Sequence, residues 1–197
     1  MRRPAPMMDS MFLRENEIGS KVAPWLEPGQ TLLDLGAGTG FISRWLRDHA
    51  GVRPTLTDVV SYQNREQSLE FLRLADPFRV PVPDASFDVV MLLFVFHHVD
   101  SYADQERLLD EAIRIARSRI VVLEDTPETR LDRAFNRAWD WLLNQRHRVP
   151  TPFTFRRSEE WVRLFKERNL SIVHVESYRP KWPSLMTYPH SAFVLDR

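Results

Sequence analysis

The stretch Thr31–Gly40, TLLDLGAGTG, decides the fold of this 197-residue chain. It reads as a short apolar strand, then an acid, then three glycines at alternate positions, and an amphipathic helical pattern begins directly afterwards at Phe41. Glycines let the backbone turn sharply with no Cβ between it and a ligand, and the start of a helix offers unpaired N–H groups. The stretch therefore predicts a strand, a glycine turn and a helix that together form a nucleotide cradle.

The spacing of the glycines helps to distinguish between two kinds of cofactor. A dinucleotide fingerprint reads G-x-G-x-x-G and needs a small third residue where the helix packs on the strand. Here Phe41 stands at that third place, and the pattern is D-x-G-x-G-x-G. Asp34 would repel a pyrophosphate, so a ligand with a cationic centre suits the turn better. The alternative is a glycine-rich turn that binds no ligand.

The motif resembles the first motif of the class I S-adenosylmethionine-dependent methyltransferases, in which an acid precedes G-x-G-x-G at the end of the first strand. A second block carries the same resemblance, because Asp76 opens a loop and S-F-D at Ser86–Asp88 follows ten positions later, before a strand. The resemblance is strong over residues 12–126 and moderate over the C-terminal strands. It looks like the type 11-like group, which includes small-molecule and quinone-type methyltransferases.

Length and composition are those of one ordinary globular domain. Apolar residues make up 43% of the chain and charged residues 27%, and the length suffices for a full core. Because there is no cysteine, disulfides and thiolate metal sites are excluded. The longest apolar run, Val89–Phe96, is too short to cross a bilayer, and no signal peptide is visible after MRRPAPMMDS. We therefore expect a cytoplasmic protein without a membrane span.

The charges balance overall but are unevenly placed along the chain. A formal net charge of zero argues against non-specific nucleic-acid binding. Residues 31–129 carry 16 acids and 10 bases, whereas residues 130–181 carry 6 acids and 12 bases. The basic segment is either a solvated surface rich in arginine or the part of the chain that meets an anionic acceptor.

Strands alternate with helices along most of the chain. This order predicts an open parallel sheet with right-handed crossovers, in which ligands bind at the carboxyl ends of the strands. We expect strands at Thr31–Leu33, Pro54–Thr57, Phe87–Phe96, Arg119–Glu124, Leu170–Tyr178 and Ser191–Leu195, and helices at residues 10–27, 41–50, 65–74, 102–117, 130–145 and 158–169. A helix followed by two strands matches the final hairpin of the family that the chain resembles.

The resemblance implies an α/β fold, with a Rossmann-like, seven-stranded, mostly parallel sheet, an antiparallel last strand and helices on both faces. We expect a single methyltransferase domain over residues 1–197. Residues 1–30 are expected to form an N-terminal tail and a helix, which Asp9 or Ser10 caps. The last helix is expected to begin at Ser158 as its N-cap.

A cap-like helical insertion is expected over residues 130–157. It matches nothing in the resembling family, in which an insertion at this place covers the acceptor site. Trp141, Phe153 and Phe155 leave room for a cap over an aromatic, lipid-like or anionic acceptor. The apolar stripe of its helix is expected to pack against the domain and consists of Leu131, Phe135, Ala138, Trp139 and Leu142.

Two adjacent histidines, His97 and His98, follow the apolar strand, and Asp100 is the acid near them. Adjacent residues on a strand point to opposite faces, so the two rings cannot serve one metal ion without a bend. We therefore expect no metal site. If the acceptor must lose a proton, His98 is the first candidate for a general base, and Asp125 and His147 follow.

The resemblance also assigns parts of the methyl donor to particular residues. It implies that the backbone around Gly36 and Gly38 approaches the amino-acid part, that Asp58 accepts the ribose hydroxyls, and that Asp76 contacts the adenine amino group. An acid in the place of Asp58 supports nucleoside binding in dinucleotide enzymes as well. The expected cofactor-binding residues are Asp34, Gly36, Ala37, Gly38, Gly40, Asp58, Val59, Asp76, Pro77 and Phe94.

The resemblance implies methyl transfer from S-adenosyl-L-methionine to a small-molecule acceptor, anionic or aromatic, by nucleophilic displacement on the sulfonium methyl. Alignment of acceptor, methyl and sulfur can supply roughly 7–11 kcal/mol of the barrier by proximity. Two alternatives remain. One is a module that binds the donor without catalysis, and the other is a nicotinamide-dependent oxidoreductase, which Phe41 and the terminal hairpin disfavour.

Overall fold

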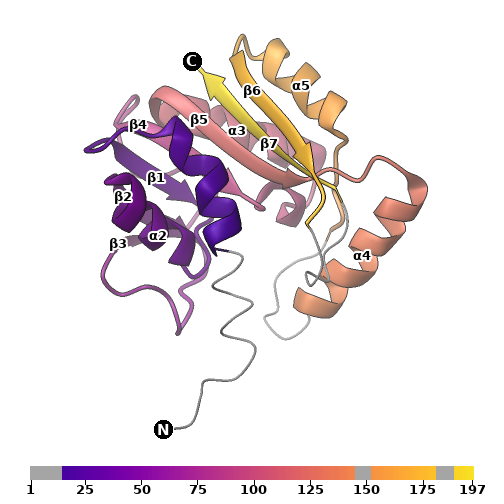
Figure 1. Cartoon of the computed structure of the whole chain (residues 1–197), viewed down its shortest axis with the longest axis horizontal. Coiled ribbons are helices and arrows are strands. Elements are labelled where there is room, and N and C mark those ends of the chain that lie inside the picture. Colours follow the sequence, from indigo (N-terminus) through magenta and orange to yellow (C-terminus); the bar gives the residue numbers. More distant parts are fainter. Residues whose placement is uncertain (1–14, 145–151, 181–188) are drawn as a thin grey trace, which may run out of the picture.

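The computed structural model describes residues 15–144, 152–180 and 189–197, and the strands within them form one sheet (Figure 1). The strands are β1 (Thr31–Leu35), β2 (Arg53–Asp58), β3 (Glu70–Arg73), β4 (Phe87–Leu93), β5 (Ala116–Asp125), β6 (Ser171–Tyr178) and β7 (His190–Asp196). Their order across the sheet is β3-β2-β1-β4-β5-β7-β6. The order runs outward from β1 in both directions, so the topological switch point lies between β1 and β4.

The strand directions confirm the expected sheet. β1 pairs in parallel with β2 and with β4, and β5 pairs in parallel with β4. β7 is antiparallel to both β5 and β6. Because β7 runs backwards, its first residue, His190, lies beside Asp125, the last residue of β5.

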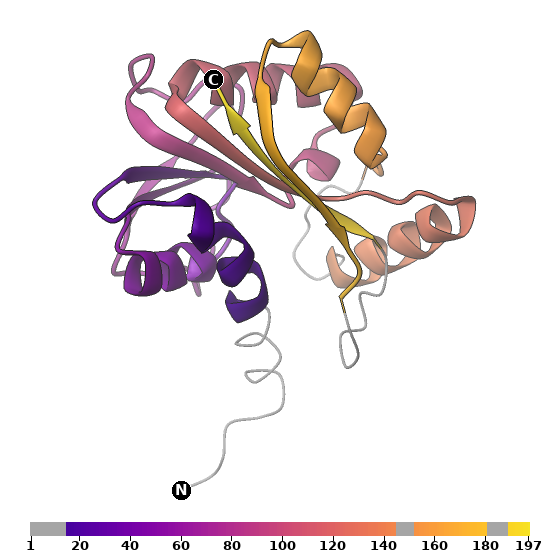
Figure 2. The ribbon, with the colours of Figure 1, turned by 45° about the horizontal axis from the view of Figure 1, so that its top comes forward.

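Helices cover both faces of the sheet, which also agrees with the expectation (Figure 2). Residues 15–22 and α2 lie on one face, whereas α3 and α5 lie on the other. The described helices are residues 15–22, α2 (Phe41–Ala50), α3 (Tyr102–Ile115), α4 (Arg130–Asn144) and α5 (Ser158–Glu167), with the 3-10 turns η1 (Ala23–Trp25) and η2 (Phe96–His98).

Successive side chains of the central strands point to opposite faces of the sheet, so each face has its own hydrophobic core. In β4, Val89 and Met91 pack with the cluster on the α2 side, whereas Val90 and Leu92 pack with the cluster on the α3 side. All four side chains are fully buried. A parallel strand that is buried on both faces reads as a continuous apolar run, and this explains why the segment is so apolar in the sequence.

The prediction of a helix over residues 65–74 is wrong. Glu70–Arg73 form β3, which pairs in parallel with β2 at the edge of the sheet. Leu69 is buried, and Phe71 and Leu72 are partly buried. The spacing of three between Leu69 and Leu72 fits a helix, whereas the spacing of two between Leu69 and Phe71 fits a strand. In so short a segment, backbone pairing with the open edge of β2 decides the structure.

The N-cap predicted for α5 is shifted by one residue. Arg157, not Ser158, is the N-cap, and its backbone N–H donates to the carboxylate of Glu160 at 2.7 Å. The acid three residues into the helix therefore satisfies the orphan donor. The N-cap predicted at Asp9 or Ser10 lies outside the described residues.

Part of the apolar stripe that α4 is predicted to pack against the domain is exposed instead, and the side chains of Trp139 and Leu142, two other members of the stripe, lie outside the described ones. Leu131 is 83% exposed and Phe135 is 45% exposed, whereas Asn136 is fully buried. The helix lies beyond the carboxyl ends of the parallel strands, beside the sheet (Figure 1). Since it covers no sheet face, the periodicity predicted an amphipathic helix correctly but not the direction of its apolar side. Trp141, off the stripe, is exposed too.

The two environments of leucine on α3 and α4 give a test of this architecture. Leu109 is fully buried on α3, so Leu109→Ala should lower the free energy of unfolding by about 2–5 kcal/mol through lost apolar contact and a cavity. The matched change Leu131→Ala, on the exposed side of α4, should alter it by less than about 0.5 kcal/mol. Urea denaturation measures both, and similar losses would contradict the orientation of α4.

Candidate functional site

The turn between β1 and α2 lies at the carboxyl edge of the sheet and is held in an unusual conformation by its glycines. Gly36, Gly38 and Gly40 have φ of 82°, 56° and 75°, all in the left-handed region. The backbone N–H groups of Gly36 and Ala37 both donate to the carbonyl of Thr57 at 2.9 Å. The turn is thereby fastened to the end of β2.

The three glycines differ in the space around them: Gly36 and Gly40 lie close to other side chains, whereas Gly38 faces open space. A Cβ on Gly36 would lie 2.7 Å from the side chain of Val95, and one on Gly40 would lie 2.4 Å from Leu56. A Cβ on Gly38 would meet nothing within 4 Å. The turn therefore presents bare backbone at Gly38, and this is the place where a ligand can approach it closely.

Asp58, at the end of β2, lies against this bare backbone. Its Oδ2 accepts the N–H of Gly38 and its Oδ1 accepts the N–H of Val60, both at 2.9 Å. The side chain is only partly buried, and Val59 beside it is exposed. Each carboxylate oxygen can accept more than one hydrogen bond, so the group can receive hydroxyl donors from a ligand while holding the turn.

Asp34 is a buried acid directly before the turn. Its Oδ2 accepts the hydroxyl of Ser43 at 2.7 Å, and the side chain is only 3% exposed. Burial raises the pKa of Asp34 to about 7, the hydrogen bond from Ser43 lowers it, and the negative charge of Asp58 raises it further. A positive charge placed nearby would favour the ionised form, which agrees with the cationic ligand expected from the sequence.

Asp76 and Pro77 lie in the loop that follows β3, next to the end of β2. Asp58 is the register partner of Arg73, and the N–H of Leu74 donates to the carbonyl of Asp58 at 2.8 Å. Asp76 is exposed, and its Oδ1 accepts the N–H of Phe78 at 2.9 Å. The structure thus places Asp76 on the loop beside the edge that carries Asp58.

The S-F-D block, Ser86–Asp88, lies at the edge of the sheet opposite the glycine turn, where it joins two strands. Asp88, near the start of β4, accepts the backbone N–H and the hydroxyl of Thr31 at 2.8 Å each. These bonds join the beginnings of β1 and β4, far along the strands from the glycine turn. The resemblance at this block therefore reflects the pairing of two strands.

Phe94, directly after β4, has a strained backbone conformation and contacts His190. It has φ of 60°, which is a strained conformation for a residue with a bulky side chain. Its N–H donates to the carbonyl of Leu123 at 2.7 Å, and its ring lies edge-on to that of His190 at 5.2 Å. Val95, the next residue, packs against Gly36.

The two adjacent histidines do not lie on a strand, which corrects the prediction. β4 ends at Leu93, and Phe96–His98 form the 3-10 turn η2. The rings of His97 and His98 are 4.0 Å apart, so they do not point to opposite faces. Within residues 15–144, 152–180 and 189–197 no group of three or more His, Asp or Glu side chains is arranged to hold a metal ion.

His97 belongs to a buried pair that the sequence did not reveal. Its Nδ1 lies 2.9 Å from Oε2 of Glu124, and both side chains are almost completely buried. Burial raises the pKa of Glu124, and the neighbouring His97 opposes the rise. Phe155 stacks on His97 at 5.5 Å and is 1% exposed, so this loop aromatic is buried against the pair.

Asp125 forms a second buried pair, with His190. Oδ1 of Asp125 lies 2.7 Å from Nδ1 of His190, and each residue is 4% exposed. Sequence reasoning named Asp125 as a base but missed His190, because only the antiparallel register of β5 with β7 brings them together. The third candidate base, His147, lies outside the described residues.

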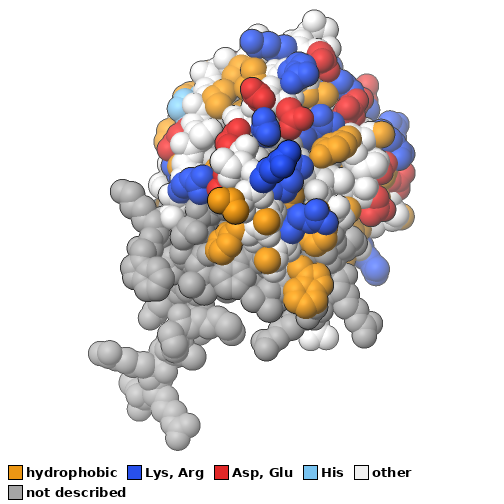
Figure 3. Space-filling view, turned by 90° about the vertical axis from the view of Figure 1, so that its right-hand side faces the viewer, with side chains coloured by type: hydrophobic (Ala, Val, Ile, Leu, Met, Phe, Trp, Pro, Cys, Tyr) orange, Lys and Arg blue, Asp and Glu red, His pale blue; other side chains and the backbone are white. Residues whose placement is uncertain are grey.

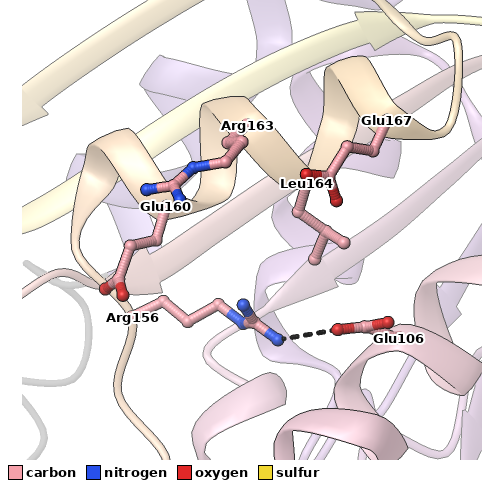
Figure 4. A pocket seen from close by; sticks show the side chains of 6 residues that line it. All are labelled: Glu106, Arg156, Glu160, Arg163, Leu164 and Glu167. Carbon is pink, nitrogen blue, oxygen red and sulfur yellow. Dashed lines mark hydrogen bonds and ion pairs between the residues drawn. The ribbon is translucent and has the colours of Figure 1, made fainter.

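A mixed-charge pocket lies between α3 and α5, on the face of the sheet away from α2 (Figure 4). Arg156 reaches across it to Glu106 at 3.2 Å. Arg168 pairs with Glu106 and with Asp110, at 2.9 and 3.2 Å. Seen from the α4 side, Lys and Arg side chains are interspersed with acidic and hydrophobic ones (Figure 3). Several bases of the C-terminal half are thus neutralised within the domain.

None of the described helices has both the length and the apolar character that a membrane span requires. The comparisons with known proteins agree with the fold. A crystal structure of a SAM-dependent methyltransferase from Methanosarcina mazei superposes with a TM-score of 0.70 at 16% identity, covering 89% of this chain and 96% of that one. This likeness shows the fold.

Two curated relatives are similar in sequence. A malonyl-[acyl-carrier protein] O-methyltransferase from Serratia marcescens is 28% identical over 151 residues, which are 74% of this chain and 58% of that protein. A demethylmenaquinone methyltransferase from Thermus thermophilus is 32% identical over 107 residues, which are 49% of this chain and 47% of that protein. The chain therefore spans about half the length of the curated relatives it matches.

A family model described as a methyltransferase domain matches residues 11–175, which is most of the chain. The match includes the glycine turn, Asp58, the loop at Asp76 and the strands up to β6. On this match, the chain belongs to the methyltransferase domain family.

Proposed function

We propose that this chain transfers a methyl group from S-adenosyl-L-methionine to a small-molecule acceptor. The observation that supports the proposal most is the open backbone at Gly38 with the carboxylate of Asp58 beside it. This arrangement fits a nucleoside ligand, because bare backbone admits it closely and the acid can accept its ribose hydroxyls. Family membership identifies the expected donor.

Different residues of the carboxyl edge hold different parts of the donor. When bound, S-adenosylmethionine supplies a methyl group on a positively charged sulfur. The turn around Gly36 and Gly38 receives its amino-acid part, Asp58 its ribose and Asp76 its adenine, while the buried Asp34 places negative charge behind the turn. Fixing the donor against the acceptor accelerates the displacement chiefly by proximity and alignment.

The acceptor is proposed to be anionic or aromatic and to bind under the segment of residues 130–157. This segment includes α4, which lies beyond the carboxyl ends of the strands, and Phe153, whose ring carries Arg137 at 4.8 Å. The names of the two relatives give precedents for a malonyl group on a carrier protein and for a demethylmenaquinone. A partly buried aromatic ring with a cation over it suits either kind of molecule.

The alternatives predict different binding. A nicotinamide-dependent oxidoreductase would bind a nicotinamide dinucleotide, and a donor-binding module would bind S-adenosylmethionine without turnover. The antiparallel β7 and Phe41 at the start of α2 disfavour the first. Calorimetric titration with each cofactor, followed by a radiolabelled methyl-transfer assay, separates the three.

Gly38→Ala tests the proposed donor site. The new methyl group meets no protein atom but occupies the space where the ligand approaches, so the affinity for S-adenosylmethionine or its demethylated product should fall at least about tenfold, or about 1.4 kcal/mol. Isothermal titration calorimetry measures this loss. The left-handed φ of 56° adds a strain of about 1–2 kcal/mol to the folded state.

Gly29→Ala is the matched control for that strain. Gly29 has φ of 86°, and a Cβ there also meets nothing within 4 Å, but it precedes β1 at the opposite edge of the sheet. Both variants should lose similar stability, whereas only Gly38→Ala should lose donor affinity. Equal affinities in the two variants would place the donor elsewhere.

Asp34→Asn tests the state of the buried acid. Because the pKa of Asp34 is about 7 in the folded protein, above the ordinary aspartate value of 3.8, the folded state holds an extra proton between these values. The stability of the wild type should therefore fall as pH rises from about 4 to 7, by up to about 4 kcal/mol. Asparagine resembles the protonated acid, so the variant should lack this part of the pH dependence. Urea denaturation across this range measures it, and parallel curves would contradict the assignment.

A further inference from the structure

The buried pair Asp125–His190 is one of two histidine–carboxylate pairs near the carboxyl edge that the proposed donor site leaves unused. Asp125 ends β5 and His190 begins β7, and the two are register partners. Their side chains are hydrogen-bonded at 2.7 Å and each residue is 4% exposed. A buried carboxylate that accepts the Nδ1–H of an imidazole fixes the tautomer, so that the basic lone pair lies on Nε2.

The pair lies on the same face of the sheet as α2 and the glycine turn. Side chains alternate along β5, and Val121 and Leu123, which share the side of Asp125, belong to the core on the α2 face. Glu124, one residue earlier, faces the α3 side with His97. The two histidine–carboxylate pairs therefore lie on opposite faces, and only Asp125–His190 shares the face of the donor site.

A short continuous path joins the pair to the glycine turn. Val95 packs against Gly36, and the ring of Phe94 lies edge-on to His190 at 5.2 Å. Phe94 holds a strained φ of 60° in this position. Strain of this kind persists where the surrounding structure demands a particular placement, and such residues cluster at functional sites.

Other charged and titratable groups near His190 come from the elements packed against it. The ring of Tyr178 on β6 lies 5.4 Å from that of His190. Lys21, in the helix of residues 15–22, lies over the Tyr178 ring at 4.1 Å and pairs with Glu176 at 2.6 Å. Asp125 is thus a charged group in direct contact with the imidazole, and the lysine charge is balanced by its own partner.

We propose that His190 is the general base that removes a proton from the acceptor and that Asp125 is its positioning residue. The proposal rests on the proposed function. An acceptor hydroxyl gives its proton to Nε2 of His190 while the oxygen lone pair forms the new O–C bond. The S–C bond of the donor breaks with its electron pair remaining on sulfur, and the proton passes from His190 to solvent. The acceptor class is therefore a hydroxyl compound that is protonated at neutral pH, and a carboxylate, already ionised, needs no such base.

This assignment differs from the bases expected from the sequence. Asp125 accepts the imidazole N–H, so its role is to orient His190. His98 lies on η2 with its ring against His97, whose partner Glu124 belongs to the opposite face of the sheet. The residue that the sequence did not suggest has both the partner and the position that a base requires.

His190→Gln tests the base with phenols of graded acidity and matched benzoates as acceptors, in a radiolabelled methyl-transfer assay. For weakly acidic phenols, kcat should fall by about 10²–10⁴-fold. For a nitrophenol in mildly alkaline buffer, which is already ionised, the loss should be at least about tenfold smaller, because no proton remains to be removed. Asp125→Asn should lower kcat for weakly acidic phenols and shift the pH profile, with donor affinity unchanged.

His174→Gln is the matched control, because it makes the same change on β6, where the ring packs on Trp25. It should leave kcat and the pH profile unchanged. The base assignment is overturned if His190→Gln slows all phenols equally, if it slows none, or if His98→Gln alone reproduces the acidity-dependent loss. It is also overturned if the wild type methylates only benzoates, or methylates no probe at all.

Donor binding separates this proposal from the proposed function. Calorimetry with S-adenosylhomocysteine should give the same affinity for the wild type, His190→Gln and Asp125→Asn, and it verifies that the variants fold. No binding by the wild type would overturn the proposed function itself. Unchanged binding with unchanged methylation of weakly acidic phenols would overturn only the role of His190.

Discussion

Parallel pairing of β1 with β2 and with β4 is the constraint on which the site depends. It brings the carboxyl ends of three strands to one edge, so that a turn after β1 meets an acid after β2 and a strained residue after β4. Thr57 fastens the turn by accepting two N–H groups, and Asp58 accepts a third from Gly38. The proposed donor site is thus a product of strand register before any ligand is present.

Because β7 is antiparallel to β5, the first residue of β7 lies at the same edge as the last residue of β5. A parallel strand contributes its last residues to this edge, whereas an antiparallel strand contributes its first. His190 therefore reaches Asp125 from the opposite direction of the chain, across a separation of 65 residues. An all-parallel sheet would leave Asp125 buried without this partner, and an unpaired buried carboxylate is costly.

The features that the sequence predicted correctly are those that depend on residues close together in the chain or on the order of the elements. The glycine turn, Asp34, Asp58 and the antiparallel ending could be inferred because each depends on a few neighbouring residues or on the order of elements. β3 could not, since Leu72 stands at a helical spacing from Leu69 and Phe71 at a strand spacing, and only pairing with the edge of β2 decides between them. The direction of α4 and the partners of Asp125 and Glu124 are set by contacts between distant segments, which a single sequence does not display.

Three acids are buried at or next to this edge of the sheet. Asp34, Glu124 and Asp125 are each almost fully buried, and each is hydrogen-bonded to a residue of another element. Replacing a buried ionic pair by apolar side chains is often neutral or stabilising, so three such acids at one edge are poorly explained by stability alone. Burial also moves the pKa of Asp34 to about 7, where a ligand's positive charge can shift its protonation. An edge that is costly to fold but poised to respond to charge is what a site for a cationic donor requires.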